Sequence, residues 1–207
     1  MNIIILGDKF QKRMKSKGCV ALIENNKKTI LDNQYNTLKS ILPQANIVYV
    51  YGFEAKKFQN YIDKHYTDIT IVHNEHYDSY NSTYSLNLAN NFLSSDCIIM
   101  FGDTILNKNI FNKFDINSGS QIFLSYNKAY KLGCTITNQT LINIDYDLNN
   151  YLYNMYYIHQ LDISKLRDIV KDNNNHNCFI FEIINKLIEH NTHIKPLFID
   201  SKKRAVA

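Results

Sequence analysis

A cluster of cations follows the first apolar run of the chain. That run is Asn2–Leu6, and five basic side chains fall within the nine residues from 9 to 17: Lys9, Lys12, Arg13, Lys15 and Lys17. Such a loop can neutralise a triphosphate, and backbone N–H groups at its turn can cradle one. It spells neither a Walker motif nor a dinucleotide fingerprint, and a solvated charged face is the alternative interpretation. We expect a nucleotide site here that includes Leu6, Gly7, Lys9 and Lys12.

Two acids stand where later apolar runs end. Asp103 follows Cys97–Phe101 and Gly102, and Asp200 directly follows His193–Ile199. Carboxylate oxygens bind Mg²⁺ beside phosphate, which is what phosphoryl and nucleotidyl transfer require. Because both runs are expected to be strands of one sheet, we expect the two acids to share a metal ion. A solvated Asp103 that begins a turn is the alternative.

A polar segment, Asn81–Leu86, opens a helical pattern. The side chains of Asn81, Ser82 and Ser85 can contact a base, a phosphate or an acceptor at the start of that helix. Ordinary capping of the helix is the alternative.

Apolar runs typical of buried strands alternate with helical stripes along the chain. The predicted strands are Asn2–Leu6, Ile47–Tyr51, Ile69–His73, Cys97–Phe101, Gln121–Ser125 and His193–Ile199. The predicted helices are Thr29–Leu42, Glu54–Lys64, Tyr84–Leu93, Ile163–Val170 and Phe179–His190. This alternation predicts one α/β domain over residues 1–207, a three-layer α/β/α sandwich with a mostly parallel, mixed sheet. Ligands bind such sheets at the carboxyl ends of the strands, where the cationic loop and both acids fall.

The composition is that of a globular chain. Hydrophobic residues make up 45% and charged residues 20%, with only six Gly and two Pro, which excludes disordered and collagen-like proteins. No apolar run reaches the roughly 18 residues of a membrane-spanning helix, and no signal-peptide pattern is present, so we expect a cytoplasmic protein. The four cysteines lack metal-ligand spacing, which argues against zinc and disulfides. Because Phe10 is the only aromatic among the loop cations, we expect no nucleic-acid binding.

Taken in order, these pieces resemble the sugar-phosphate and choline-phosphate nucleotidyltransferases, a family with a GT-A-like fold. The family opens with L-A-A-G-x-G-x-R-M and then P-K-x-L, matched here by Leu6 to Met14 and by Ala21-Leu22-Ile23. Its T-N-x-x-Y-S-L segment is matched by Asn81, Tyr84, Ser85 and Leu86, and its metal-binding G-D by Gly102-Asp103. The stretches Ile30–Gln34 and Phe181–Ile188, and the pair Ile199-Asp200, are similar to its later elements.

The resemblance implies an enzyme that transfers a nucleotidyl group from an NTP, with CTP the first choice. The acceptor would be a phosphosugar or a phospho-alcohol such as phosphocholine, and pyrophosphate would leave. Asp103 and Asp200 would hold Mg²⁺, and Arg13 with Lys17 or Lys9 would neutralise the donor phosphates. The phosphate of the acceptor is already a nucleophile at neutral pH, so no general base is required. Homo-oligomer formation is left open.

The loop departs from the family pattern, which leaves two alternatives. Lys9 and Gln11 replace its glycines, and Cys19-Val20 replace its Pro-Lys pair. In an active enzyme, Lys17 or Lys9 would substitute for the missing lysine. A nucleotide-binding module that has lost catalysis is the first alternative. A glycosyltransferase of the same fold type is the second; its D-x-D acids would be matched by Asp145-Tyr146-Asp147, which we interpret as an exposed turn.

Overall fold

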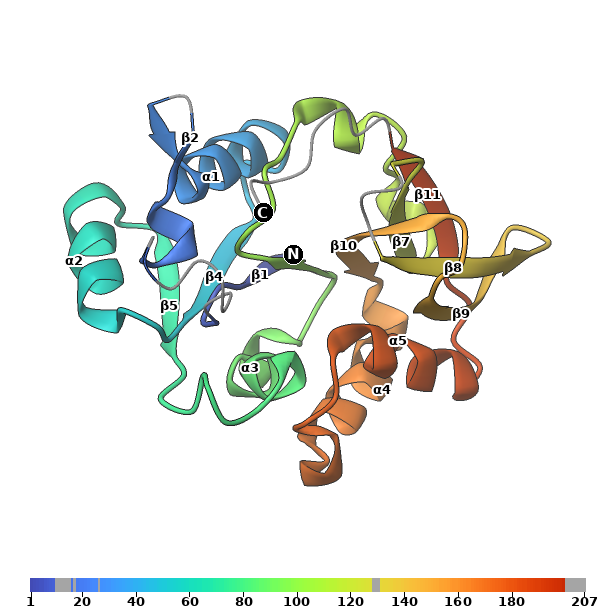
Figure 1. Cartoon of the computed structure of the whole chain (residues 1–207). Coiled ribbons are helices and arrows are strands. Elements are labelled where there is room, and N and C mark those ends of the chain that lie inside the picture. Colours follow the sequence, from blue (N-terminus) through green and yellow to red (C-terminus); the bar gives the residue numbers. More distant parts are fainter. Residues whose placement is uncertain (10–15, 17, 26, 128–130, 200–207) are drawn as a thin grey trace.

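The computed structural model describes residues 1–9, 16, 18–25, 27–127 and 131–199. Its centre is a seven-stranded sheet with the order β11-β7-β10-β6-β1-β4-β5 (Figure 1). The strands are β1 (Asn2–Leu6), β4 (Asn46–Tyr51), β5 (Ile69–His73), β6 (Cys97–Phe101), β7 (Gln121–Ser125), β10 (Tyr151–Ile158) and β11 (Lys195–Ile199). Within this sheet β10 runs antiparallel to β6 and β7, and the other neighbours pair in parallel. The predicted mostly parallel, mixed sheet is confirmed.

The strands at the middle of the sheet are apolar on both faces because both faces are covered. In β1, Ile4 pairs with Val48 of β4 and with Ile99 of β6, and all three side chains are fully buried. A strand that is buried on both faces reads as a continuous apolar run and not as an alternating one. This is why NIIIL and CIIMF could be recognised as strands from the sequence.

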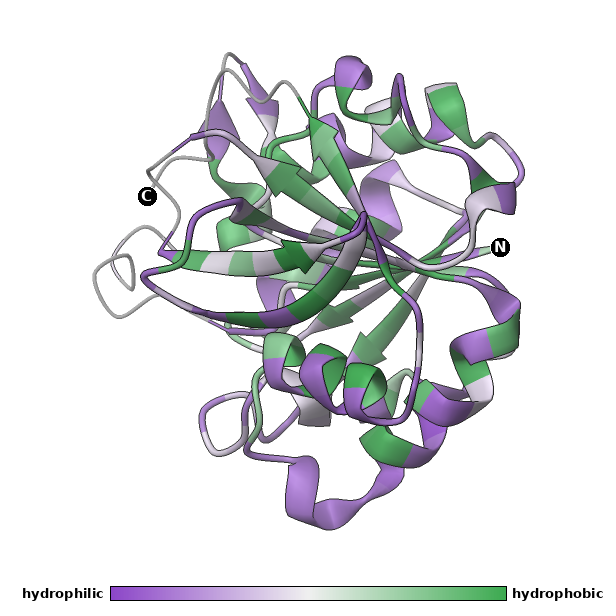
Figure 2. Cartoon of the chain, turned by 90° about the vertical axis from the view of Figure 1, so that its right-hand side faces the viewer, coloured by the Kyte–Doolittle hydropathy of each residue, from purple (hydrophilic) through white to green (hydrophobic). Residues whose placement is uncertain are grey.

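Helices cover both faces of the sheet, so the expected three layers are present (Figure 1). One apolar cluster joins the sheet to α1 (Ile30–Ile41) and α2 (Ala55–His65). A second cluster joins the other face to α3 (Ser82–Leu88), α4 (Gln160–Lys171), α5 (Ile180–Glu189) and the hairpin of β8 (Leu132–Thr137) and β9 (Thr140–Tyr146). Figure 2 shows the apolar strands enclosed between helices whose hydrophilic sides face outward.

The smaller elements connect these layers. A two-stranded ribbon of β2 (Glu24–Asn25) and β3 (Lys28–Thr29) precedes α1. Short 3₁₀ segments occupy Val20–Leu22, Asn90–Phe92, Lys108–Phe111, Ile116–Ser118 and Asn173–Asn175. No helix within the described ranges combines the length and the apolar character that crossing a membrane requires.

Five strands were not expected from the sequence: the short β2 and β3, and the longer β8, β9 and β10. In β10, Asn154 has a positive φ of 59°, and the register with β7 shifts between Leu152 and Tyr156. This irregularity interrupts the alternation by which a strand is recognised. The helix predicted from Tyr84 to Leu93 begins earlier, at Ser82, and ends at Leu88.

The D-x-D spelling lies on the β8–β9 hairpin. Asp145 and Tyr146 are the last residues of β9, and Asp147, with a φ of 58°, begins the turn that follows. All three residues are exposed, as predicted. Only Asp147 lies in a turn, because Asp145 and Tyr146 still belong to β9.

Candidate functional site

A cavity of about 270 Å³ opens at the carboxyl ends of β1 and β6. These strands are parallel neighbours, so the loops that follow them meet at one edge of the sheet. The lining residues are Leu6, Gly7, Asp8, Lys9, Val20, Ser82, Phe101, Gly102 and Asp103. Six of them were selected from the sequence as site residues: Leu6, Gly7, Lys9, Ser82, Gly102 and Asp103. The structure therefore gathers residues that lie almost 100 positions apart around one space.

Two glycines form bare backbone at this edge because a tyrosine lies against them. A Cβ at Gly7 would lie 2.1 Å from the Tyr49 hydroxyl oxygen, and a Cβ at Gly102 would lie 2.5 Å from the same atom. Strand-like hydrogen bonds hold both glycines, since Gly7 N donates to Val50 O and Gly102 N donates to Leu6 O, each at 2.9 Å. The Tyr49 hydroxyl is buried and has no hydrogen-bond partner among the described residues.

The loop that carries Asp103 is held by α1. The fully buried Gln34 side chain donates from Nε2 to the carbonyl oxygens of Phe101 (3.2 Å) and Thr104 (2.8 Å), on either side of Gly102-Asp103. The preceding residue, Asn33, donates from Nδ2 to Leu106 O (3.1 Å), and its Oδ1 accepts from Leu106 N (2.7 Å). Gln34 belongs to the helical stretch that resembles the family, and the structure shows that its amide fixes the turn bearing the half-buried Asp103.

Helix α1 is itself fixed at its start. Thr29 accepts from Asp32 N at 3.0 Å, and Asp32 accepts from Thr29 N at 2.9 Å, which completes a capping box. Partial burial raises the pKa of Asp32, but hydrogen bonds from Tyr66, Thr29 and Tyr61 outweigh it, so the pKa lies below its usual value.

Asp8 is a buried acid in the cavity wall that the sequence analysis did not select. Its residue is 2% exposed. Its Oδ2 accepts from Ser85 Oγ at 2.8 Å and from Asn74 Nδ2 at 2.9 Å. Burial raises the pKa of the Asp8 carboxyl, although these hydrogen bonds and the charge of Lys9 act in the opposite direction. The signal that singled out Asp103, an acid just after a buried strand and a glycine, was also present at Gly7-Asp8.

Ser85 occupies a different place from the one expected of a ligand contact. It is fully buried on α3 and is not among the residues that line the cavity. Its hydroxyl is used to hold Asp8. Ser85 therefore acts on the cavity through the carboxyl of Asp8.

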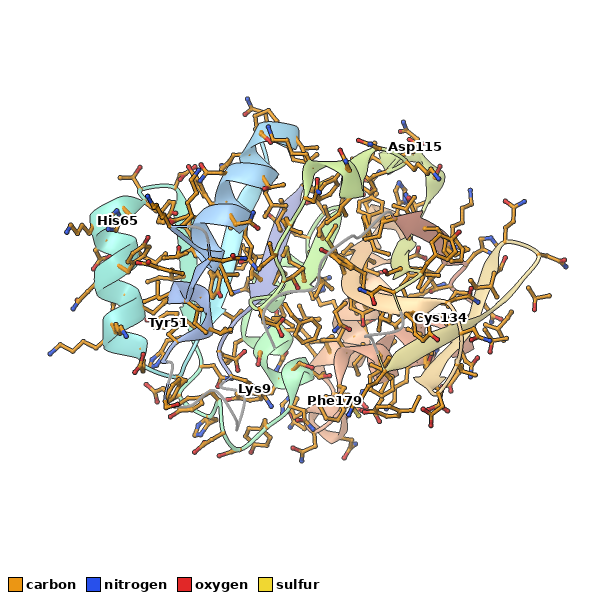
Figure 3. The ribbon with its side chains drawn as sticks, turned by 45° about the horizontal axis from the view of Figure 1, so that its top comes forward. Lys9, Tyr51, His65, Asp115, Cys134 and Phe179 are labelled. Atoms are coloured by element: carbon orange, nitrogen blue, oxygen red, sulfur yellow. The ribbon has the colours of Figure 1, made fainter. Side chains whose placement is uncertain are left out.

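Lys9 lies beside the start of α3, as Figure 3 shows. Its Nζ donates to the Tyr80 carbonyl oxygen and, at 3.2 Å, to Asn81 Oδ1. Partial burial lowers the pKa of Lys9, and the charge of Asp8 acts against that shift. Asn81 also donates from Nδ2 to Asn177 O at 2.5 Å, and Ser82 Oγ accepts from Ile180 N at 3.1 Å. The polar side chains at the start of α3 thus bind Lys9 and the segment before α5.

Four predicted site residues, Lys12, Arg13, Lys17 and Asp200, lie outside the described residues. The strands that lead to Asp103 and Asp200, β6 and β11, are separated by β10 and β7. Three inter-strand steps correspond to about 14 Å, so membership of one sheet does not by itself bring the two acids together. Their sharing of a metal ion stays a prediction.

The described residues contain no cluster of three or more His, Cys, Asp or Glu side chains suited to a metal ion. Mg²⁺ bound beside phosphate commonly takes only one or two carboxylates, the remaining ligands being phosphate and water oxygens. The carboxylate of Asp103 in the cavity wall fits that mode of binding.

No family model matches the chain. Over 119 residues the chain is 39% identical to choline-phosphate cytidylyltransferase of Haemophilus influenzae, a match that covers 54% of this chain and 47% of the relative. The chain thus spans about half the length of the curated relative that it matches.

The CTP:phosphocholine cytidylyltransferase from Streptococcus pneumoniae aligns with a TM-score of 0.82 at 18% identity, over 98% of this chain and 91% of that one. The fold is that of the nucleotidyltransferases. The inositol-1-phosphate CTP transferase from T. maritima aligns with a TM-score of 0.74 at 12% identity, over 95% and 84% of the two chains. The resemblance to the nucleotidyltransferases expected from the sequence is confirmed.

Proposed function

We propose that this protein is an Mg²⁺-dependent cytidylyltransferase that acts on a phosphorylated small acceptor. The observation that carries the proposal is the cavity in which Gly7, Gly102 and Asp103 meet at the carboxyl ends of β1 and β6. Support for the donor and acceptor classes comes from the 39% identity to choline-phosphate cytidylyltransferase. CTP and phosphocholine are therefore the first substrates to test.

In the proposed reaction an oxygen of the acceptor phosphate attacks the α-phosphorus of CTP. The bond from that phosphorus to the bridging oxygen breaks, and pyrophosphate leaves with the electron pair. Mg²⁺, when bound, neutralises charge on the phosphate oxygens. Asp103 would hold that ion together with Asp200, and Arg13 with Lys17 would neutralise the β- and γ-phosphates. The bare backbone at Gly7 and Gly102 lets the nucleotide approach the strand ends closely.

An exposed tyrosine stacked on a half-buried phenylalanine at the same edge of the sheet supports an acceptor with a quaternary ammonium group. Tyr126 directly follows β7 and is 71% exposed, and its ring stacks on Phe198 of β11 with centroids 5.0 Å apart and planes 15° apart. Aromatic faces attract such cations electrostatically. Strand β7 lies two steps from β6, about 10 Å along the sheet, which suits the far end of a small acceptor whose phosphate lies near Asp103.

Pyrophosphate release tests the proposal. The full chain is incubated with Mg²⁺, CTP and a panel of acceptors that includes phosphocholine and sugar 1-phosphates. Turnover with a phosphorylated acceptor supports cytidylyl transfer, and the variant Asp103→Asn should abolish it while keeping the melting temperature. Nucleotide binding without turnover on any acceptor would indicate a binding module, and turnover of a nucleotide sugar would indicate a glycosyltransferase.

The acceptor assignment has its own control. Tyr126→Ala should raise KM for phosphocholine while leaving the affinity for CTP unchanged, because only the acceptor side is altered. Tyr146 on the β8–β9 hairpin is also exposed, at 53%, and Tyr146→Ala is the matched substitution that should change neither value. Equal effects of the two variants would contradict the acceptor assignment.

A further inference from the structure

The buried carboxyl of Asp8 has no part in the reaction just proposed. It lies in the cavity wall with its residue 2% exposed, and taking an acid out of water is costly unless it is paired. Both side-chain donors that reach it, Ser85 and Asn74, bind the same oxygen, Oδ2. No described side chain donates to Oδ1, which leaves that oxygen to the Asp8 backbone N–H or to a ligand.

The carboxyl is rigidly placed. Asn74 is fully buried, and its own Oδ1 accepts from His76 N at 2.9 Å, which fixes the orientation of its amide. Asn74 Nδ2 also lies 3.3 Å from Ser85 Oγ, so the three side chains form a closed network that links the loop after β1, the loop after β5, and α3. The Asp8 backbone is held as well, because its carbonyl oxygen accepts from Phe53 N at 2.9 Å. A group positioned in this way can discriminate between ligands by hydrogen bonding.

The surroundings of Asp8 suit a flat, largely apolar ligand group. Leu6, Val20 and Phe101 line the cavity with it, and the two glycines contribute only backbone. A carboxylate repels phosphate and any carbonyl oxygen, but it accepts a hydrogen bond from an amino group. Among pyrimidines, cytosine presents a 4-amino donor where uracil presents an oxygen acceptor, and acidic side chains read cytosine through that amino group.

We propose that Asp8 determines the base specificity of the protein by accepting a hydrogen bond from the cytosine 4-amino group at Oδ1. Ser85 and Asn74 are positioning residues that hold Oδ2 and thereby aim Oδ1. The inference rests on the proposed function for the presence of a nucleotide in this cavity, and goes beyond it in naming the residue that selects CTP over UTP.

The test is isothermal titration of the full chain with CTP and with UTP in the presence of Mg²⁺. The wild type should bind CTP about 10- to 100-fold more tightly than UTP, the discrimination expected of one well-placed base contact. In Asp8→Asn the new side chain can still accept from Ser85 and Asn74 through its oxygen, but it turns an amide donor toward the ligand. The ratio should therefore fall to about one or invert in favour of UTP.

Three companion measurements make the outcome interpretable. Asp8→Asn is nearly isosteric, and its melting temperature shows that it folds. Ser85→Ala keeps the carboxyl but loosens it, so it should lower the CTP-to-UTP ratio by less than Asp8→Asn does. Asp78→Asn changes an exposed acid in the loop before α3 and should keep the wild-type ratio.

The possible failures are distinguishable. If the wild type binds neither nucleotide, the proposed function is wrong and the inference falls with it. If the wild type binds both equally, or if Asp8→Asn keeps the wild-type ratio, the nucleotide site stands and the role of Asp8 is overturned. If Asp8→Asn weakens CTP and UTP equally and removes the Mg²⁺ dependence of binding, Asp8 is a metal ligand and not a base reader.

Discussion

Replacing Gln34 by Met should disturb the turn that carries Asp103 while leaving α1, the helix to which Gln34 belongs, intact. Met is close to Gln in length and is as good a helix former, so α1 should persist. The substitution removes the Nε2 donor from the carbonyl oxygens of Phe101 and Thr104, which lie 3.2 and 2.8 Å away. Because Gln34 is fully buried, water cannot readily replace the lost donor.

The expected loss of folding stability follows from the carbonyl oxygens of Phe101 and Thr104, which lose their hydrogen-bond donor. Leaving a buried polar group unsatisfied costs about 1–3 kcal/mol. The substitution also removes Gln34 Oε1, which has no hydrogen-bond partner among the described residues, and this recovers part of the loss. We expect a net destabilisation of about 2 kcal/mol, which lowers the melting temperature by about 4–8 °C in a chain of this size. A small displacement of Asp103 should lower kcat by about 10- to 100-fold.

Denaturant titration and the pyrophosphate assay check the two parts separately. Gln59 on the exposed side of α2 is the matched control, and Gln59→Met should change the free energy of unfolding by less than about 0.5 kcal/mol. If Gln34→Met is as stable as this control and keeps wild-type kcat, the reasoning that α1 positions Asp103 is refuted.

Further substitutions test the other contacts of the site and its supports. Gly7→Ala places a Cβ 2.1 Å from the Tyr49 hydroxyl oxygen and should lower the free energy of unfolding by about 1–3 kcal/mol through overpacking. The double variant with Tyr49→Phe should recover part of this loss in thermal unfolding. Equal melting temperatures for Gly7→Ala and wild type would count against the steric explanation. Thr29→Ala breaks the capping box with Asp32 and should cost about 1 kcal/mol in urea unfolding, whereas a cost below about 0.3 kcal/mol would show that the cap is dispensable. The raised pKa of Asp8 means that the folded state binds its proton more tightly than the unfolded state, for which the ordinary value is 3.8. The free energy of unfolding of the wild type, relative to that of Asp8→Asn, should therefore fall as pH rises above that value. A difference in unfolding free energy that does not change with pH would disprove the raised pKa of Asp8.

The amino-acid sequence alone determined four strands of the seven-stranded sheet. Asn2–Leu6, Ile69–His73, Cys97–Phe101 and Gln121–Ser125 were predicted with the bounds that the structure shows. Each is built around a short apolar or β-branched run, a local signal that needs no knowledge of the partner strand. The β8–β9 hairpin and β10 were missed because they depend on pairing across the sheet, and β10 is interrupted at Asn154.

The same division applies to the site. That Gly102-Asp103 lies at a ligand-binding edge follows from its place after a buried strand, because the carboxyl ends of parallel strands form such an edge. Tertiary packing alone decided what surrounds it: Gln34 of α1 holds the turn, and Tyr49 of β4 lies against the glycines. Tertiary packing also decided that the Ser85 hydroxyl donates to the carboxyl of Asp8 instead of lining the cavity. Periodicity shows which face of an element is buried, whereas the partner of a buried polar group depends on which distant segments the fold brings against it.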